Sequence, residues 1–227
     1  MRALLLPIKD HRNAKQRLAG ALSPEERLAL ARAMMDDVLL AVRNVRRAAR
    51  IFVVTNYEPA MRVAESAGWS VLAEDEQISE SASVDAASRQ CAAQGVTALL
   101  RLPLDLPLVQ AADIDELLEL EFSSRAAVMV PSRDGTGTNA LLRTPPTLFP
   151  SQFGPGSFAK HHTLAQASGA QILVPRNPRL EMDVDDAEDL AALLKQDLYG
   201  TATGRWLSAS GVAARFATSK ERSTSAD

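Results

Sequence analysis

Short apolar runs alternate with amphipathic segments along most of the chain. The clearest run, at 51–54, is continuous and β-branched, which is typical of a strand buried in a parallel sheet. Strands are predicted over residues 3–8, 51–54, 70–73, 98–102, 127–130, 140–142, 172–174 and 182–184. Apolar positions at helical spacing predict helices over about residues 24–42, 58–67, 83–94, 113–120, 157–168 and 186–198. The alternation predicts an α/β fold with a mainly parallel sheet and helices on both faces.

Local signals mark the starts of several elements. Ser23 is expected to cap the first helix, because Pro24 suits its first turn and Glu26 completes a capping box. Other expected caps are Asp113, Ser157 and either Asp185 or Asp186. The strands at 127–130 and 140–142 flank a turn-rich loop, so they predict one antiparallel hairpin in the sheet.

The length of 227 residues fits one α/β domain. We expect this domain to span residues 1–198, followed by a tail over residues 199–227 that is rich in Ser, Thr, Ala and Gly. Apolar residues of the tail are expected to pack back as a short helix, namely Trp206, Leu207, Val212 and Phe216. From about Thr218 onward the composition is typical of disorder.

Charge and cysteine content narrow the class of protein. The formal net charge of −3 provides no overall basic field, so neither nucleic acid nor an acidic membrane is an expected partner. No apolar stretch approaches the roughly 18 residues of a membrane span. Cys91 is the only cysteine, which excludes an intramolecular disulfide and argues against a cysteine zinc site. We therefore expect a cytoplasmic protein.

A cationic loop follows the first predicted strand and carries Lys9, Arg12, Lys15 and Arg17. Ligands of open α/β sheets bind beyond the carboxyl ends of strands, so this loop is a candidate cradle for a triphosphate. Lys15 and Arg17 would offset the charge of a leaving pyrophosphate. A solvated surface loop is the plainer alternative. The chain has neither a Walker motif nor a Gly-x-Gly-x-x-Gly after this strand, which disfavours a P-loop or dinucleotide site.

Aspartates recur at two distant places. Asp105 follows the strand predicted at 98–102, where an acid is well placed to hold Mg²⁺ together with substrate phosphates. Asp183 and Asp185 are two apart in an expected extended segment, so they would share one face, and either could complete the metal site with Asp105. Asp186 is more typical of a helix cap. A turn aspartate and an acidic helix start are the structural alternatives for the two places.

Two glycine-rich segments offer anion sites. The loop at 132–139 brings Thr138 and Asn139 as donors, and the Phe-Gly-Pro-Gly-Ser-Phe segment at 153–158 opens a helix whose N–H groups can bind phosphate or carboxylate. Together they suit an acidic second substrate, although a hairpin turn and a plain helix cap would leave the same pattern. Adjacent His161 and His162 point in different directions on a helix, which favours structural roles.

The helix predicted at 83–94 begins with Ser83 and Asp85. These side chains could approach the base or ribose of a nucleotide, or they could simply cap the helix.

These motifs together resemble the guanylyltransferases that activate a small phosphorylated three-carbon acid in the biosynthesis of coenzyme F-420. The resemblance covers about Leu5 to Leu194, leaves the tail after Tyr199 outside, and rests on segments 7–9, 14–18, 105–108, 135–141, 153–158, 183–185 and 188–190. The Gly-Thr-Gly-Thr-Asn loop and the Phe-Gly-x-x-Ser helix start are its specific parts. The sequence departs from the family pattern at Val84-Asp85 and at Asp186-Ala187.

The resemblance implies a single-domain, Rossmann-like nucleotidyltransferase fold of the nucleotide-diphospho-sugar transferase type that uses Mg²⁺ and GTP. It implies an acid site formed by Thr138, Gly154 and Ser157, and metal ligands at Asp105 and Asp183, with Asp185 in support. Nucleotide contacts are expected from Lys9, Lys15, Ser83 and Asp85, and catalytic roles from Lys15, Arg17 and Asp105.

The expected reaction transfers GMP from GTP to the phosphate of phosphoenolpyruvate, 2-phospho-L-lactate or 3-phospho-D-glycerate. Phosphoenolpyruvate is favoured, because bacterial members of the family resemble that type. A downstream biosynthetic enzyme is the expected recipient of the unstable product. Alternatives are a nucleotidyltransferase for a molybdopterin or a sugar or polyol phosphate, a glycosyltransferase using the Asp-x-Asp at 183–185, and a non-catalytic GTP-binding protein.

Overall fold

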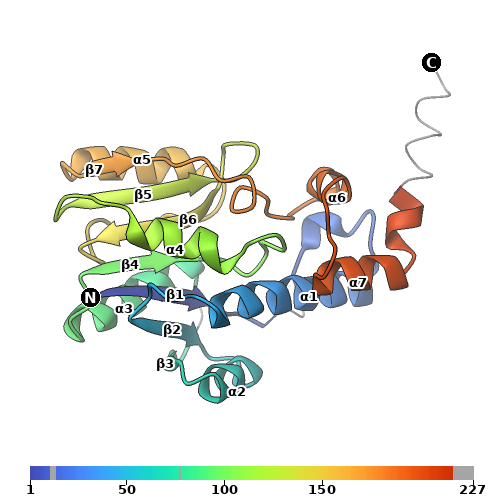
Figure 1. Ribbon diagram of the computed structural model, residues 1–227, viewed down its shortest axis with the longest axis horizontal. Coiled ribbons are helices and arrows are strands. Elements are labelled where there is room, and N and C mark those ends of the chain that lie inside the picture. The colour runs from blue at the N-terminus through green and yellow to red at the C-terminus, as the bar shows by residue number, and fades with distance from the viewer. Residues whose placement is uncertain (11–13, 77, 217–227) are drawn as a thin grey trace.

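The computed structural model describes residues 1–10, 14–76 and 78–216 and shows one mixed sheet in the order β3-β2-β1-β4-β6-β5-β7 (Figure 1). Its strands are β1 (Arg2–Pro7), β2 (Arg50–Thr55), β3 (Ser70–Ala73), β4 (Ala98–Arg101), β5 (Ala126–Pro131), β6 (Thr138–Thr144) and β7 (Gln171–Leu173). Only β6 among them runs antiparallel to its neighbours, so the predicted mainly parallel sheet and its antiparallel hairpin are confirmed.

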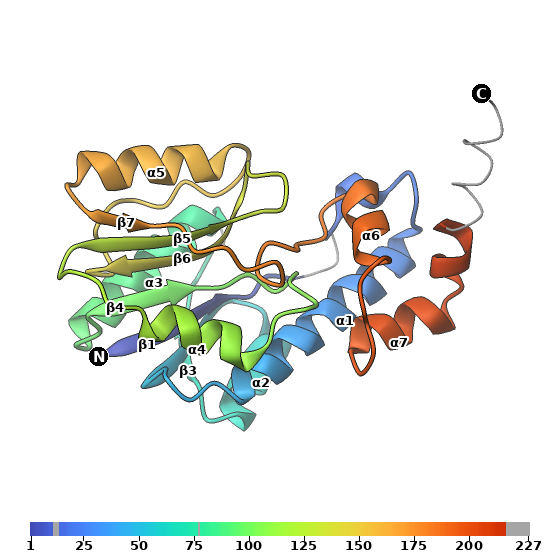
Figure 2. The same cartoon turned by 45° about the horizontal axis from the view of Figure 1, so that its top comes forward.

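Helices cover both faces of this sheet (Figure 2). They are α1 (Pro24–Arg43), α2 (Glu58–Ser66), α3 (Glu80–Ala93), α4 (Ala111–Glu119), α5 (Ser157–Ala167), α6 (Ala187–Leu193) and α7 (Ala202–Ala209), with a short 3₁₀ helix η2 (Gln16–Leu18). Alternate strand residues point to opposite faces. Leu4 and Leu6 of β1 therefore pack in the cluster with α1, α2 and α4, whereas Ala3 and Leu5 pack against α3.

A separate apolar cluster lies beyond the end of the sheet, where α1 extends toward α6 and α7 (Figure 1). Leu207 and Val212 are buried there together with Leu30 and Met34 of α1. Asp37 of α1 accepts hydrogen bonds from the Ala202 and Thr203 N–H groups at the start of α7, at 2.6 and 2.9 Å. The predicted helix of the tail is thus present and anchored. The disorder predicted from about Thr218 falls outside the described residues.

Several predicted boundaries need correction. The segment 182–184 is irregular and forms no strand, and α6 ends at Leu193. Helix α3 starts at Glu80, because Ser79 accepts a hydrogen bond from Ala82 N–H and caps it. Gly156, in a left-handed conformation, is the N-cap of α5 in place of Ser157.

Of the remaining predicted helix starts, one was wrong and two are confirmed. Asp113 is the third residue of α4, where it closes a capping box with Gln110. The predicted capping box at Ser23 and the Asp186 cap of α6 are both confirmed.

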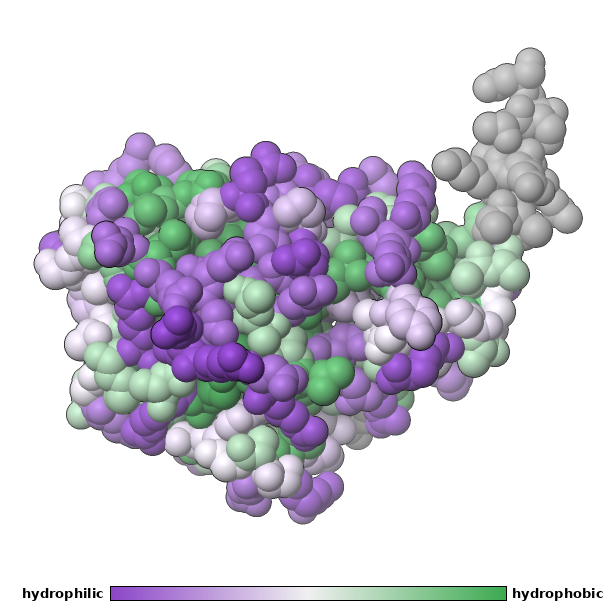
Figure 3. Space-filling model, in the orientation of Figure 1, coloured by the Kyte–Doolittle hydropathy of each residue, from purple (hydrophilic) through white to green (hydrophobic). Residues whose placement is uncertain are grey.

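The carboxyl ends of β1, β4 and β5 lie at one edge of the sheet, because these strands are parallel. The chain returns into β6 at Thr138 from the same edge. Hydrophilic residues dominate the region of Figure 3 between the apolar corner near α5 and β7 and the apolar area around α6. Among the described helices, none is long and apolar enough to cross a membrane.

Candidate active site

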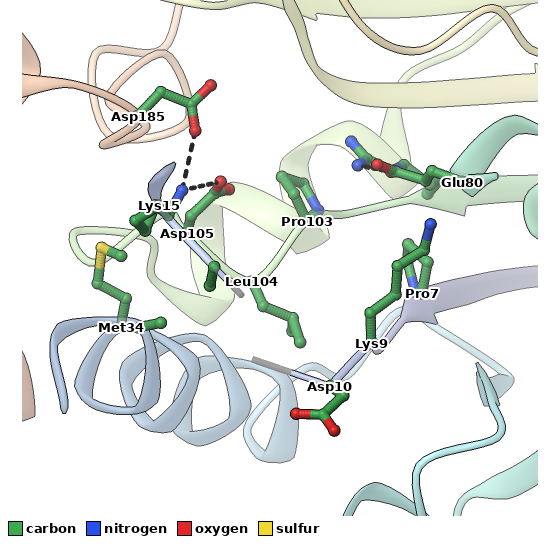
Figure 4. Close-up of a pocket in the computed structure, with 13 residues that line it drawn as sticks. Pro7, Lys9, Asp10, Lys15, Met34, Glu80, Pro103, Leu104, Asp105 and Asp185 are labelled. Atoms are coloured by element: carbon green, nitrogen blue, oxygen red, sulfur yellow. Dashed lines mark hydrogen bonds and ion pairs between the residues drawn. The ribbon is translucent and has the colours of Figure 1, made fainter. Parts of the chain in front are cut away.

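Three distant segments meet at Lys15. Its Nζ lies 2.7 Å from Asp105 Oδ2 and 2.9 Å from Asp185 Oδ1 (Figure 4). Lys15 lies between β1 and η2, Asp105 follows β4, and Asp185 precedes α6. The structure therefore brings together one predicted cation and two predicted acids. They line a cavity of about 370 Å³, with Lys9 and Glu80 on its other side in this view.

Lys15 is held by both its backbone and its charge. Its φ of 56° is left-handed, which is uncommon for a residue with a side chain and is maintained only where the surroundings demand it. The side chain is 9% exposed. Burial opposes its charged form, but the Asp105 and Asp185 carboxylates outweigh that effect and raise the Lys15 pKa above its ordinary value. The ammonium is therefore fully charged at neutral pH.

Arg17 extends the same cluster toward solvent. It lies 3.2 Å from Asp185 and 3.7 Å from Asp186, and its side chain is 64% exposed. An exposed ion pair of this kind is worth little in stability and can open easily for an incoming anion. Lys9 lines the cavity, whereas Arg12 of the predicted cationic cradle lies outside the described residues.

Asp183 does not share a partner with Asp185. The segment around it is irregular, and its Oδ1 accepts a hydrogen bond from Asn139 Nδ2 at 3.1 Å. Asn139 also donates to the Leu180 carbonyl at 3.0 Å, which ties β6 to the chain before Asp183. Burial and the nearby Asp105 charge raise the Asp183 pKa to about 7. A nearby cation would lower this pKa and favour the ionised carboxylate.

The acidic residues suit a hard cation that is shared with a substrate. No group of three or more His, Cys, Asp or Glu side chains in the described ranges is arranged as a metal cage. Two carboxylates do converge on the Lys15 ammonium, and the elevated Asp183 pKa reflects a third acid nearby. Because Mg²⁺ usually takes one or two carboxylates plus substrate phosphates and waters, this donor set fits that ion.

A second cavity, of about 750 Å³, lies beside the first and shares Asp105, Asp185 and Arg101 with it. It is lined by the predicted acid-binding residues Thr138, Gly154 and Ser157. Ser157 Oγ donates to Thr138 Oγ1 at 3.2 Å, so the first residue of β6 and the first residue of α5 are in direct contact. The structure thus brings these three residues to one wall.

The loop before Thr138 is braced by its own side chains. Asp134 accepts hydrogen bonds from Ser132 Oγ at 2.5 Å and from Thr136 N–H at 2.9 Å. Gly137 N–H donates to Ser132 Oγ at 2.7 Å, and a Cβ at Gly137 would come within 2.9 Å of that same oxygen. A side chain at position 137 would push Ser132 Oγ aside, so the glycine preserves the hydrogen bond that braces the loop.

Sequence reasoning overlooked Arg101 and Glu80, which line both cavities. The Arg101 guanidinium pairs with Glu80, lies 4.2 Å from the centre of the Phe153 ring, and donates to the Thr138 carbonyl at 3.3 Å. Its buried Nε has no hydrogen-bond partner among the described residues. The sequence did offer a signal for Arg101, because it is a cation at the end of an otherwise apolar strand.

Ser83 and Asp85 lie away from both cavities. Ser83 is buried and donates to the Ser79 carbonyl at 3.0 Å. Asp85 pairs with buried Arg143 at 3.2 Å and accepts from Ser151 Oγ at 2.7 Å. The structure therefore does not bring them together with Lys9 and Lys15, and their nucleotide-binding role stays a prediction.

The fold is shared with solved structures of very different sequence. A Desulfovibrio desulfuricans G20 protein described as a nucleotide-diphospho-sugar transferase superposes with a TM-score of 0.76 at 14% identity, over 95% of this chain and 97% of that one. The arrangement of strands and helices is thus of the nucleotide-diphospho-sugar transferase type, as predicted. This likeness defines the class of fold, and the cation–carboxylate cluster lies at the strand ends of that fold.

The chain belongs to the CofC-like guanylyl transferase family, whose model matches residues 1–225. This range includes the tail after Tyr199, so leaving the tail outside the family pattern was wrong. The predicted family of coenzyme F-420 guanylyltransferases, and with it the prediction of a guanylyltransferase enzyme, is confirmed.

Relatives of known name differ in their acid substrate. A phosphoenolpyruvate guanylyltransferase of Rubrobacter xylanophilus is 36% identical over 83% of this chain and 91% of its own length. A 2-phospho-L-lactate guanylyltransferase of Methanothermobacter thermautotrophicus is 32% identical over 88% and 85% of the two chains. A 3-phospho-D-glycerate guanylyltransferase of Phenylobacterium zucineum is 33% identical over 83% of this chain and 88% of its own length.

Proposed function

We propose that this enzyme transfers GMP from GTP to the phosphate of phosphoenolpyruvate and releases diphosphate. The observation that carries the proposal is the pair of adjoining cavities that share Asp105 and Asp185. One cavity carries the cations Lys9 and Lys15, which suit a polyphosphate. The other combines the hydroxyls of Thr138 and Ser157 with arginine side chains, which suits a small phosphorylated acid. A nucleotide in the first would meet the acid of the second at the shared carboxylates.

The proposed step is a single in-line displacement. A phosphate oxygen of the acid attacks the α-phosphorus of GTP, a new P–O–P linkage forms, and the bond to the β-phosphate oxygen breaks. The electron pair of that bond leaves with diphosphate. The attacking oxygen is already anionic, so no protein base is needed, and the residues contribute by positioning and by neutralising charge.

Lys15 and Arg17 would neutralise the leaving diphosphate. Their present partners are carboxylates, and phosphate oxygens can replace those carboxylates without moving either cation far. Asp105 and Asp183, with Asp185 in support, would hold Mg²⁺. When bound, that ion lowers the cost of bringing two anionic phosphates together and polarises the reacting phosphorus.

Thr138, Gly154 and Ser157 would hold the acid in the second cavity. The choice of phosphoenolpyruvate draws support from the relative at 36% identity, although relatives of similar identity are named for other acids. In the product a diphosphate links the acid to guanosine, and this linkage is readily hydrolysed. We therefore infer that a downstream biosynthetic enzyme takes up the product directly.

Release of diphosphate tests the proposal. The purified protein is given GTP and Mg²⁺ with phosphoenolpyruvate, 2-phospho-L-lactate or 3-phospho-D-glycerate in turn, with ATP and the Asp105→Ala variant as controls. Release that requires both GTP and phosphoenolpyruvate is the expected result. Release with another acid alone would reassign the acceptor, and no release with any acid would overturn guanylyl transfer to this class.

A further inference from the structure

Two adjacent histidines of α5 have different surroundings. His161 is 0% exposed and lies against the rings of Phe149 and Phe153, with centroids at 6.2 and 4.9 Å. His162 is only partly buried and lies near Phe158, with centroids at 6.3 Å. A buried imidazole needs hydrogen bonds at both nitrogens, so the partners of His161 reveal where its hydrogen is.

The backbone fixes the tautomer of His161. The Gln152 N–H donates to His161 Nε2 at 2.8 Å, so Nε2 carries a lone pair and no hydrogen. In the neutral ring the hydrogen is then on Nδ1, which lies 3.0 Å from Thr138 Oγ1. Burial, followed by the charges of Arg143 and Arg101, lowers the His161 pKa to about 4, in accord with a neutral ring at pH 7.

This tautomer determines what the Thr138 hydroxyl can do. Its oxygen accepts from His161 Nδ1–H and from Ser157 Oγ, at 3.0 and 3.2 Å, which uses both of its lone pairs. Its own hydrogen must therefore point elsewhere, and Thr138 lines the second cavity. A hydroxyl fixed in this way can only donate to a ligand.

We propose that His161 is a positioning residue that holds the Thr138 hydroxyl as a dedicated hydrogen-bond donor to an anionic oxygen of the phospho-acid. The inference rests on the proposed function, because it takes the second cavity as the acid site. The group recognised at Thr138 is then an ionised carboxylate or phosphate oxygen. His161 has no contact with substrate in this role and acts entirely through Thr138.

Paired amide variants separate this role from simple packing. The amide of His161→Asn reaches the region of Nδ1 and can still donate to Thr138, whereas that of His161→Gln reaches the region of Nε2 and cannot. The KM values for acid and for GTP, and kcat, are measured for both variants. His162→Asn, one position away on the same helix, is the matched control and should leave all three unchanged.

We expect His161→Gln to raise the KM for the acid roughly tenfold to a hundredfold, the range for losing a hydrogen bond to a charged group. The KM for GTP should change less than about twofold, and His161→Asn should recover most of the acid affinity. Equal effects of Asn and Gln, or a parallel rise in the KM for GTP, would overturn the assignment, since packing alone makes no distinction between the two nitrogens.

The tautomer itself can be read without any variant. Long-range ¹H–¹⁵N spectra of the wild-type enzyme should show a protonated Nδ1 and a bare Nε2 for His161 from about pH 8 to pH 5. A hydrogen on Nε2 would overturn the proposal even if the His161 variants failed to fold. If the wild-type enzyme is inactive with every acid, the proposed function is wrong. If the wild type is active and the His161 variants leave the KM for the acid unchanged, only the role of His161 is wrong.

Discussion

The two walls of the candidate site offer different groups to an anion. On the charged wall, Lys15 and Arg17 are full charges paired with Asp185, and Lys15 is paired with Asp105 as well. On the neutral wall, the side chains of Thr138, Ser157 and His161 form a buried uncharged network, and Arg101 donates to the Thr138 carbonyl behind it. Both sides lie at the same edge of the sheet, but they differ in what a ligand must displace.

The charged wall must exchange partners when phosphates arrive, because its cations already hold carboxylates. The neutral wall would exchange nothing, because in the proposed role His161 orients the Thr138 donor in advance. Changes to the charged wall should therefore reduce turnover, and changes to the neutral wall should reduce affinity for the acid. The following variants test that contrast in order of expected effect.

Asp105→Ala should have the largest effect. Asp105 lines both cavities and is the proposed metal ligand at their junction, so its removal should lower turnover by about a thousandfold or more. Diphosphate release measures the loss, and circular dichroism with thermal unfolding checks that the fold is intact. A folded variant with near-full activity would remove Asp105 from the site.

Lys15→Met should lower turnover about a hundredfold to a thousandfold and raise the KM for GTP. The matched variant Arg17→Met removes the exposed cation of the same cluster and should cost less, about tenfold, because solvent screens its charge. Steady-state kinetics with GTP varied at saturating acid measures both. Equal losses of turnover in the two variants would show that the burial of Lys15 does not make its charge more effective than that of Arg17.

Thr138→Val should raise the KM for the acid roughly tenfold to a hundredfold with little change in the KM for GTP. The variant removes the donor while keeping a similar volume, and Thr138→Ser restores the hydroxyl and should stay near wild type. Kinetics with the acid varied at saturating GTP measures the change. A large loss of kcat without a change in acid affinity would contradict the contrast between the walls.

Asp183→Asn should change stability in a pH-dependent way. The folded pKa of about 7 lies above the ordinary value of 3.8, so ionisation of Asp183 costs the folded state progressively more as pH rises from about 4 to 7. In metal-free protein the variant should therefore gain stability as pH rises, by at least about 1 kcal/mol at pH 8, since one pKa unit corresponds to about 1.4 kcal/mol.

Urea unfolding in a chelator at pH 4, 6 and 8 measures this gain. A gain that is constant across the range, or largest at pH 4, would show that the carboxylate is not disfavoured by its surroundings. The same variant should lose activity, because Asn is a poorer ligand for Mg²⁺ than an ionised carboxylate.

Elements with strong local signals could be predicted from the sequence. The apolar runs of the central strands and the capping box at Ser23 depend on neighbouring residues only, and both predictions agree with the structure. The strand prediction at 182–184 was wrong, because two apolar residues alternating with an acid resemble a strand although the segment has no strand partner here. Local pattern carries no information about pairing.

The residues of the charged wall could also be predicted from the sequence, because cations and acids that follow strand ends are expected at one edge of the sheet. The roles of Arg101 and His161 were not, since each depends on what the fold places opposite it. Arg101 became part of the site through Glu80 and Phe153, and His161 through Gln152 and Thr138.

By itself the sequence determined the α/β class, the family and the chemical kinds of residue at the site, because these follow from periodicity and motifs along the chain. Only the tertiary structure decided that Lys15 lies between Asp105 and Asp185, which are 90 and 170 residues away. It also decided which nitrogen of His161 faces Thr138. Hydrogen bonds and buried charges act over a few ångströms in space, and sequence separation does not measure that distance.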